Sequence, residues 1–259
     1  MMSVQKVFKR RELKYLITEK EKTALLKVMQ NYMEPDKYGK STINNIYLDT
    51  PDKLLVRKSL AKPEYKEKIR IRSYGKTNSE STVFIEVKKK YQGIVYKRRI
   101  ALKEVEAMNY IYRGILPSNQ NQIFKEIDYL LHFYKDIEPS IFLSYDREAF
   151  YSRIDPNFRM TFDENILMRN SDLTLTSTPY GERSIPEGIS ILEVKTSMGL
   201  PKWLYTFLSK KKIYKTSFSK YGNAYMKLQL PAFLNENTLS KNQFIKRVVD
   251  QGGMEYANQ

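Results

Sequence analysis

Charged and apolar residues alternate along several short stretches of the chain, most clearly in Lys-Glu-Lys-Ile-Arg-Ile-Arg-Ser over residues 66–73. Successive side chains of a β-strand point to opposite faces, so this stretch would place all of its cations on one face. Same-face neighbours are about 6.6 Å apart, and adjacent cations then repel by roughly 2 kcal/mol at an effective dielectric near 20. A solvated face tolerates this repulsion because salt screens it, whereas an enclosed face requires an anionic partner.

The same alternation predicts an antiparallel sheet, and apolar residues at helical spacing predict the helices around it. We expect strands over residues 4–17, 42–49, 66–74, 82–90, 93–102, 140–151, 157–165 and 189–196. We expect helices over residues 18–33, 50–60, 103–114 and 119–135, and from Pro201 and near Tyr221. Thr18 and Glu21 have the spacing of a capping box, and Thr50-Pro51 is expected to cap the second helix. Residues 170–188 are expected to form a loop or an irregular hairpin.

No stretch of the sequence has the composition of a linker. We therefore expect one domain over residues 1–230, followed by a C-terminal helix or tail over residues 231–259.

The composition indicates a folded protein with an anionic partner. Hydrophobic residues make up 41% of the 259 residues, which is typical of a chain with a real core. Lys and Arg number 45 against 29 Asp and Glu, so the formal net charge is +16. Nucleic acid, phosphates and an acidic membrane surface all suit such an excess, and charge alone does not choose among them.

The sequence holds few residues for nucleophilic or His-based chemistry. It has no cysteine, which excludes disulfides, thiolate catalysis and Cys-ligated zinc, and His132 is the only histidine. His132 is expected to have a structural role on a helix. A metal would therefore have to be bound by carboxylates, which favours Mg²⁺ or Mn²⁺. With no signal-peptide pattern and no apolar run near the ~18 residues of a membrane span, we expect a cytoplasmic protein.

The charged strand faces allow two arrangements. An open sheet would be a basic platform, whereas closure into a barrel of about eight strands would turn the cations inward around one small ligand. Arg forks and Lys point charges suit a triphosphate or polyphosphate chain. An interior carboxylate could hold a divalent cation bridging phosphate oxygens, with Glu193 the first candidate and Glu86 the second, although either could be an ordinary cross-strand ion-pair partner.

In its residues and their order along the chain, the sequence resembles the VTC-domain polyphosphate polymerases, a branch of the triphosphate tunnel metalloenzymes. Nine short stretches carry the resemblance, in family order, from about residue 8 to 228. They are Glu12-Leu-Lys-Tyr-Leu-Ile17, Tyr47-Leu-Asp-Thr50, Lys68-Ile-Arg-Ile-Arg-Ser-Tyr-Gly75, Phe84-Ile-Glu-Val-Lys-Lys89, Lys97-Arg-Arg99, Ser144-Tyr-Asp-Arg-Glu-Ala-Phe150, Arg159-Met-Thr-Phe-Asp163, Leu192-Glu-Val-Lys195 and Ser217-Phe-Ser-Lys-Tyr-Gly222.

The resemblance implies an α+β fold, a closed antiparallel β-barrel forming a tunnel with helices packed around it. It implies transfer of the γ-phosphate of ATP to a growing inorganic polyphosphate chain, with Mn²⁺ or Mg²⁺. It further implies roles for ten residues: Arg70, Arg72, Arg147 and Lys220 in catalysis, Lys14, Lys88, Lys97, Tyr145 and Ser219 in phosphate binding, and Glu193 as the metal ligand.

One departure from the wider superfamily bears on the reaction. The superfamily opens with Glu-x-Glu-x-Lys on its first strand, and this chain has Arg10-x-Glu12-x-Lys14. The loss of one carboxylate suits the polymerase branch and argues against a hydrolase that needs two metals.

Three classes of function stay open at this stage: a polymerase, a tunnel hydrolase acting on tripolyphosphate or a nucleotide, and a non-catalytic polyphosphate-binding module. DNA and RNA are not expected as partners because no aromatic-interleaved RNA-binding motif is present. Association with a membrane protein is left open.

Overall fold

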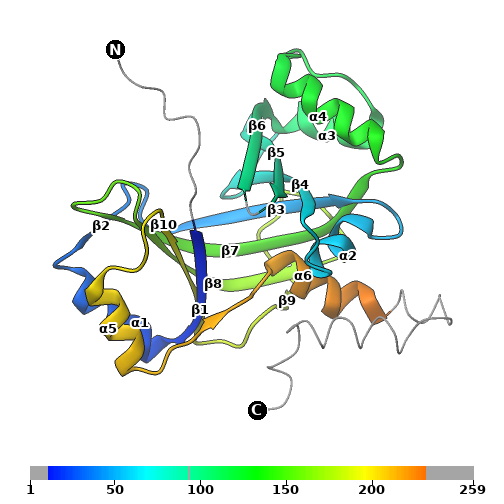
Figure 1. Ribbon diagram of the computed structural model, residues 1–259. Helices are drawn as coiled ribbons and strands as arrows, with labels where there is room; N and C mark the ends of the chain where they lie inside the picture. Colours follow the sequence, from blue (N-terminus) through cyan, green and yellow to red (C-terminus); the bar gives the residue numbers. More distant parts are fainter. Residues whose placement is uncertain (1–10, 93, 232–259) are drawn as a thin grey trace. The chain divides into compact units, whose positions relative to one another are not determined.

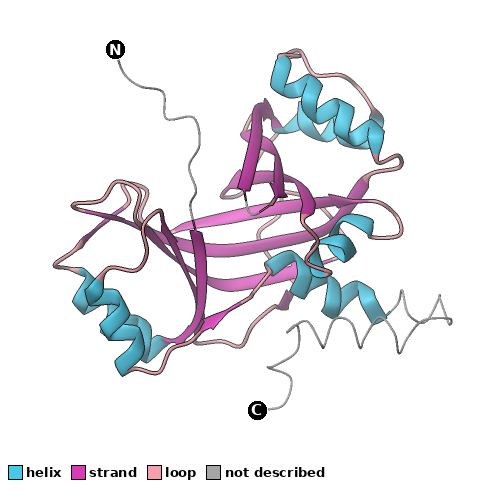
Figure 2. Ribbon diagram, viewed as in Figure 1, coloured by secondary structure: helices cyan, strands magenta, loops and turns pink. Residues whose placement is uncertain are grey.

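The structure is a computed structural model that describes residues 11–92 and 94–231. The predicted start of the first strand, before Arg11, and nearly all of the predicted C-terminal helix or tail lie outside these residues. Figure 1 labels the elements along the chain, and Figure 2 colours the helices, strands and loops.

The predicted strands are present with small shifts at their ends. The strands are β1 (Arg11–Thr18), β2 (Met33–Pro35), β3 (Ser41–Asp49), β4 (Tyr65–Tyr74), β5 (Thr82–Tyr91), β6 (Ile94–Lys103), β7 (Glu138–Ser152), β8 (Arg159–Arg169), β9 (Glu182–Arg183), β10 (Ile189–Thr196) and β11 (Lys215–Thr216). The helices are α1 (Glu19–Met29), α2 (Leu54–Leu60), α3 (Glu104–Arg113), α4 (Gln122–Phe133), α5 (Lys202–Lys210), α6 (Lys220–Ala224) and the π-helix η1 (Tyr225–Gln229). The expectation of an antiparallel sheet accompanied by helices is therefore confirmed.

The prediction of a closed barrel of about eight strands is wrong for the described residues. Their sheet has eleven strands, hydrogen-bonded in the order β11-β1-β10-β8-β7-β3-β4-β5-β6, with β2 on β7 and β9 on β8. The order starts at β11 and ends at β6, so hydrogen bonds do not close it into a ring. The composition of β6 fits an edge strand, because Lys97, Arg98 and Arg99 follow one another there and charged side chains discourage further strand pairing.

The chain divides into two compact units, each assembled from three stretches. Unit 1 comprises Met1–Thr42, Tyr145–Ile166 and Ile185–Phe218, and unit 2 comprises Ile43–Ser144, Leu167–Ser184 and Ser219–Gln259. That residues 1–230 form one domain stays a prediction, and each unit is described by itself below.

In unit 1, two helices cover the apolar face of a short sheet. Strands β1, β8 and β10 pair antiparallel, and alternate residues such as Tyr15, Phe162 and Leu192 are buried in one core. Helices α1 and α5 contribute Leu25 and Leu204 to that core, and they lie side by side in Figure 1. The opposite face of the three strands, with Lys14, Asp163 and Glu193, is left for polar side chains.

In unit 2, strands β4, β5 and β6 form a meander with strict alternation. Ile69, Ile85 and Ile100 are buried and belong to one apolar core. Helices α3 and α4 cover this core, where Tyr110 and Phe124 pack with ring centroids 5.0 Å apart (Figure 1). The other face of the meander carries the cations that the sequence pattern placed there.

Helix starts agree with the sequence in one case and differ in another. The capping box of α1 is confirmed, because Thr18 Oγ1 accepts from Glu21 N while the Glu21 carboxylate accepts from Thr18 N. Helix α2 starts at Leu54, not directly after Pro51. Buried Asp49 accepts from the backbone N–H groups of Leu55 and Val56, so a carboxylate from the end of β3 stabilises the first turn.

The remaining expectations fall on short elements. Residues 170–188 are irregular except for the two-residue strand β9, as predicted, and α5 begins directly after Pro201. The helix expected near Tyr221 begins at Lys220 and continues into η1. In the described part of the chain, no helix combines the length and the apolar character that crossing a membrane requires.

Candidate phosphate-binding site

The charged face of unit 2 is arranged as a ladder across β4, β5 and β6. Residues directly opposite each other in an antiparallel pair share a face, so the register defines successive rungs of side chains. The rungs are Arg72–Phe84–Ala101, Arg70–Glu86–Arg99, Lys68–Lys88–Lys97 and Lys66–Lys90–Val95. Strand β3 adds Asn45 beside Arg72 and Tyr47 beside Arg70. The expected cationic face of Lys66, Lys68, Arg70 and Arg72 is therefore present.

Glu86 lies at the centre of this ladder and is 2% exposed. Arg70 donates from Nε and Nη2 to Glu86 Oε2, at 2.9 and 2.7 Å, and Lys97 Nζ lies 2.7 Å from Oε1. Arg72 Nε is 3.8 Å from Oε2, and Arg99 Nε is 3.5 Å from Oε1. We call these four cations and Glu86 the Glu86 cluster. One carboxylate thus neutralises only part of the charge around it.

The electrostatics of Glu86 follow from this crowding. Burial acts to raise the pKa of Glu86, but the charges of Arg70 and Arg72 and the contact with Lys97 outweigh burial and lower the pKa to about 2. The pKa of Lys97 is lowered, mainly by burial and further by the charges of Arg70 and Arg72, although Glu86 acts to raise it. Glu86 is therefore an internal anion that holds the cations in place.

Two residues of β3 complete the setting of the arginines. Asn45 Oδ1 accepts from Arg72 Nε at 2.9 Å, and Tyr47 OH accepts from Arg70 Nη1 at 3.1 Å. Burial acts to raise the pKa of Tyr47, but Arg70, Arg72 and Lys220 lower it below its usual value. These polar partners fix the two guanidinium groups in defined orientations, which is the preorganisation that anion binding requires.

A buried aromatic pair positions the segment that carries Ser219 and Lys220. The Tyr47 and Tyr221 rings stack with centroids 4.3 Å apart, and Tyr221 OH donates to Asp49 Oδ2 at 2.6 Å. Ser219 accepts from Gly222 N as the N-cap of α6 and from Lys68 Nζ at 2.9 Å. The hydrogen bond from Lys68 therefore connects Ser219 to the charged face. Lys220 is buried, and its charge helps to lower the pKa of Tyr47.

Unit 1 carries a second cluster of charges on the polar face of its sheet. Arg147 donates from Nε and Nη2 to the two oxygens of Asp163, at 2.5 and 2.6 Å, and from Nη2 to Glu193 Oε2 at 3.4 Å. Lys14 Nζ lies 3.5 Å from Glu193 Oε1 and donates to the carbonyl of Phe218 at 2.9 Å. Lys14, Arg147, Asp163 and Glu193 are called the Arg147 cluster below.

The Arg147 guanidinium is strongly held. Burial acts to lower the pKa of Arg147, but Tyr145, Asp163 and Glu193 raise it well above its usual value. The guanidinium carbon lies 5.2 Å from the centre of the Tyr145 ring. Tyr145 is therefore placed to support Arg147 and is itself buried.

Glu193 is the residue that the sequence predicts as the ligand of a divalent cation. The contacts from Glu193 to Lys14 and Arg147, at 3.5 and 3.4 Å, are longer than a tight ion pair. Its cross-strand neighbour Thr161 has a buried hydroxyl oxygen without a hydrogen-bond partner. Mg²⁺ commonly binds one or two carboxylates and takes its other ligands from water and substrate phosphates, so a single Glu suffices.

Glu86, the second metal candidate, behaves instead as an ion-pair partner, because both of its oxygens face cations. No group of three or more Asp, Glu or His side chains arranged for a metal occurs within residues 11–92 and 94–231. A preformed all-protein metal site is therefore not seen in this part of the chain.

The ten residues predicted from the sequence fall into two sets, one in each unit. Arg70, Arg72 and Lys97 belong to the Glu86 cluster, and Lys88 lies directly opposite Lys97 in the same rung. Ser219 and Lys220 lie at the start of α6 in the same unit. Lys14, Arg147 and Glu193 belong to the Arg147 cluster with Tyr145 beside it. Their roles in a reaction stay predictions.

Sequence reasoning missed four residues that hold these clusters together: Asn45, Tyr47, Arg99 and Asp163. Arg99 and Asp163 lie on strand faces that the alternation marks as polar, so a signal was present for these two, whereas both faces of the strand with Asn45 and Tyr47 mix polar and apolar residues. The sequence does not indicate which charged side chain each of these residues contacts.

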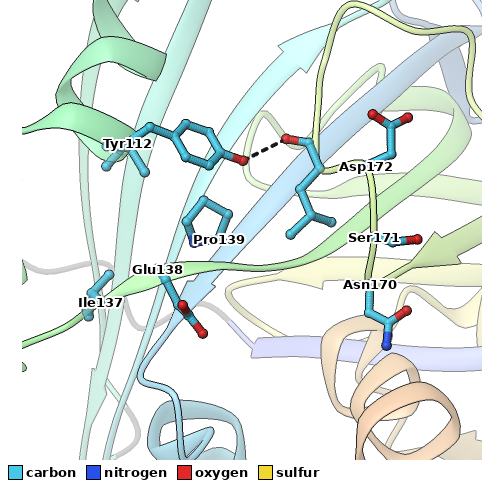
Figure 3. A pocket seen from close by; sticks show the side chains of 9 residues that line it. Tyr112, Ile137, Glu138, Pro139, Asn170, Ser171 and Asp172 are labelled. Atoms are coloured by element: carbon cyan, nitrogen blue, oxygen red, sulfur yellow. Dashed lines mark hydrogen bonds between the residues drawn. The ribbon is translucent and has the colours of Figure 1, made fainter.

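Unit 2 also has a pocket of about 400 Å³ outside the ladder, formed by the end of α3, the start of β7 and the loop after β8 (Figure 3). Tyr112 OH donates across it to the carbonyl of Leu173 at 3.0 Å. None of the ten predicted residues lines this pocket, and its lining includes Glu138 and Asp172. Carboxylates suit a polyanion poorly, so the charged strand faces are the better candidate site.

Charged residues along one face of an antiparallel sheet and helices over the other define an α+β protein. The chain belongs to the VTC domain family, whose model matches residues 9–229. The family resemblance predicted from the sequence is therefore confirmed.

Solved structures share the fold at low sequence identity. A candidate adenylate cyclase from Bacillus halodurans is 14% identical, with a TM-score of 0.51 over 82% of this chain and 94% of that chain. A candidate adenylate cyclase from Vibrio parahaemolyticus is 13% identical, with a TM-score of 0.44 over 85% and 98%. The Mimivirus capping enzyme triphosphatase is 11% identical, with a TM-score of 0.34 over 86% and 91%. The first of these carries the likeness in fold, and no curated protein matches the chain.

Proposed function

We propose that this protein is a polyphosphate polymerase that transfers the γ-phosphate of ATP to a growing inorganic polyphosphate chain. The observation that carries the proposal is the Glu86 cluster, in which four cations converge on one buried carboxylate. Arg forks bind phosphate oxygens at two points, so Arg70 and Arg72 suit a phosphoryl group. Membership of the VTC domain family supports the same assignment.

Phosphoryl transfer depends mainly on positioning and on neutralising charge, and it requires little covalent chemistry from the protein. In this proposal Arg70 and Arg72 of unit 2 bind a phosphoryl group, and Lys220 of unit 2 and Arg147 of unit 1 also act in catalysis. Lys14, Lys88, Lys97, Tyr145 and Ser219 bind the other phosphates. The acceptor is a terminal phosphate, which is already anionic near neutral pH, so no histidine base is needed.

Glu86 sets the condition for binding. It accepts two hydrogen bonds from Arg70 and has a third contact with Lys97. A phosphate carries more negative charge than a carboxylate, so it can share these cations while Glu86 stays in place. The cations are thereby held in position before the substrate arrives, which reduces the cost of ordering them on binding.

Mn²⁺ or Mg²⁺ is part of the proposal, and Glu193 is the residue that would hold it. When bound, such an ion neutralises charge on the phosphate oxygens and orients them. Arg147 and Lys14 would stay beside Glu193 and contribute further positive charge.

Tracing of labelled phosphate tests this function. The purified protein is incubated with Mn²⁺ and with ATP labelled in either the γ- or the α-phosphate. The proposal predicts that γ-label enters an acid-labile polymer and that α-label does not.

Two other outcomes would each overturn the proposal in favour of a different function. Release of γ-label as orthophosphate without polymer would identify a tunnel hydrolase. Tight binding of polyphosphate with no metal-dependent turnover of any substrate would identify a binding module.

A further inference from the structure

A long part of the sequence after Glu193 carries positive charge only. No Asp, Glu or Arg occurs between Glu193 and Glu236, whereas this stretch holds eight lysines. Five of them are exposed in unit 1, on helix α5 or soon after it, and we call these the α5 lysines: Lys202, Lys210, Lys211, Lys212 and Lys215. Within residues 11–92 and 94–231, none of the α5 lysines forms an ion pair with a carboxylate.

The α5 lysines lie on the side of the unit 1 sheet that faces away from the Arg147 cluster. Helix α5, beside α1 in Figure 1, packs Leu204 and Leu208 into the apolar core, which covers the face of the sheet opposite Glu193. Lys215 of β11 is paired with Tyr15 of β1, so it shares the face on which the helices pack. An anion bound at the Arg147 cluster is thus on the other face of the sheet, and the α5 lysines need a different partner.

The end of α5 places a lysine where glycine is usual. Ile213 N donates to the carbonyl of Leu208 at 2.9 Å, and Lys212 N donates to the carbonyl of Ser209 at 3.1 Å, which is the pattern of a Schellman motif. Lys212 therefore adopts a left-handed conformation, with a φ of 54°. A cation in the last turn stabilises a helix through its dipole, which accounts for Lys210 but not for Lys212. The chain keeps this positive charge at a position that disfavours any side chain.

Exposed side chains with apolar surface accompany the α5 lysines. Tyr205 is 63% exposed and Tyr214 is 78% exposed, and Met198, in the loop before α5, is 93% exposed. On the helix, Tyr205 shares its exposed face with Lys202, three residues before it. Tyrosine combines an apolar ring with a polar tip and is enriched where a membrane meets water. Inorganic phosphates offer nothing apolar to such side chains, so a lipid surface fits this patch better than a dissolved polyanion.

The use of lysine alone points to the same partner. Arginine provides two-point binding of single phosphates and is enriched in protein interfaces, from which lysine is depleted. Clusters of about four to eight basic residues are attracted to the diffuse negative charge of anionic lipids. The apolar face of α5 is already buried in the core, so the helix can rest on the lipid head groups but has no free apolar face to insert.

We propose that the α5 lysines, Tyr205, Tyr214 and Met198 form a surface that docks this protein on a membrane containing anionic phospholipids. The lysines lie at the lipid phosphates, and the other three side chains lie among the head groups. The inference is independent of the proposed function, because none of these residues belongs to the Glu86 cluster or the Arg147 cluster.

Flotation with lipid vesicles, without ATP or metal, tests the surface. The full chain is mixed with vesicles of phosphatidylcholine alone or of phosphatidylcholine with phosphatidylglycerol. We expect binding to the anionic vesicles only, with an affinity that falls as salt is added. The triple variant Lys210→Gln/Lys211→Gln/Lys212→Gln should bind them at least about tenfold more weakly, because each lysine at an anionic surface adds to the affinity.

The matched control is Lys58→Gln/Lys76→Gln/Lys125→Gln, which removes the same charge from exposed positions of unit 2 and should bind within about twofold of the wild type. Tyr205→Ser/Tyr214→Ser should weaken vesicle binding about threefold without changing its dependence on salt, because it removes no charge.

Four results would each overturn the docking surface. They are no flotation of the wild type, equal binding to neutral and anionic vesicles, equal losses in the two triple variants, and a triple variant at Lys210–Lys212 that loses affinity for dissolved long-chain polyphosphate but not for vesicles. Because turnover is not measured, a protein that floats as expected but makes no polymer would refute the polymerase and leave the docking surface standing.

Discussion

Arg70 directs two of its nitrogen atoms, Nε and Nη2, to a single oxygen of Glu86, at 2.9 and 2.7 Å. The other Glu86 oxygen faces Lys97 Nζ at 2.7 Å and Arg99 Nε at 3.5 Å. The guanidinium keeps its remaining nitrogen, Nη1, on Tyr47 OH at 3.1 Å. This arrangement orders the cations around one buried carboxylate and makes each member of the Glu86 cluster a separate test of the account.

Arg70→Ala should lower ATP-dependent polymer synthesis by at least about 100-fold, as is found when one donor to a developing charge is removed. The control is Arg98→Ala, which removes an exposed arginine from the opposite face of β6, where it pairs with Glu126. Circular dichroism and thermal unfolding should show both variants folded. Synthesis by Arg70→Ala at the level of Arg98→Ala would remove Arg70 from the site.

Glu86→Gln should change stability in a pH-dependent manner. The pKa of Glu86 is lowered from 4.5 to about 2, so its ionised form contributes stability that is complete above the unfolded value of 4.5 and is lost as the pH falls through about 2. This lowering of the Glu86 pKa corresponds to about 3 kcal/mol of folding stability. The difference in unfolding free energy between wild type and variant should therefore be largest near neutral pH and should shrink between pH 4.5 and 2.

Urea unfolding across that pH range measures the difference directly. Added tripolyphosphate should stabilise Glu86→Gln more than the wild type, because the variant lacks its internal anion and the four cations of the cluster then depend on the ligand. A stability difference that does not vary with pH would contradict the assignment of Glu86 as the ionised counter-charge.

The Arg147–Asp163 pair should be essential for the stability of unit 1. Asp163 is fully buried, and its two oxygens accept from Arg147 at 2.5 and 2.6 Å. Removing one partner of a buried ion pair leaves an uncompensated charge and costs about 3–5 kcal/mol. Arg147→Met and Asp163→Leu should each lower the unfolding free energy by that amount, and the double variant should recover part of it. Purely additive losses in this double-mutant cycle would show that the pair is not coupled.

Glu193→Gln should weaken Mn²⁺ binding in the presence of tripolyphosphate by about tenfold, because a neutral amide replaces the carboxylate ligand. Isothermal titration calorimetry provides the measurement, and Glu187→Gln, which neutralises an exposed carboxylate of unit 1, is the control. Polymer synthesis should fall with metal affinity, while the thermal midpoint should change by only a few degrees. Unchanged Mn²⁺ affinity would exclude Glu193 as the metal ligand.

The sequence predicted the strands and their faces well because alternation is a local property. The stretch over residues 66–73 showed which side chains would share a face, and the short separations to the next two strands indicated antiparallel hairpins. Those two facts together imply the cationic ladder. They do not reveal register, so the position of Glu86 between Arg70 and Arg99 could not be read in advance.

The Arg147 cluster was harder to foresee because its members come from four strands, β1, β7, β8 and β10, that span residues 11–196 of the sequence. Asp163 ends one of the nine stretches that carry the family resemblance, but its pairing with Arg147 depends on how β7 and β8 pack together, and a sequence pattern does not specify this. Whether a buried Glu binds a metal ion or pairs with Lys and Arg likewise depends on its neighbours, so the sequence offered Glu193 as the first metal candidate and Glu86 as the second. The failed expectation of a closed barrel has the same origin, because closure depends on the two edge strands.

Phosphorus-31 NMR of a reaction mixture containing the protein, ATP and Mn²⁺ tests the central claim most directly, since one spectrum separates bridging phosphates, terminal phosphates and orthophosphate. The account predicts that the signal of bridging phosphates in long chains grows at the expense of the γ-phosphate of ATP. Growth of orthophosphate alone, or a spectrum that does not change with time, would contradict it.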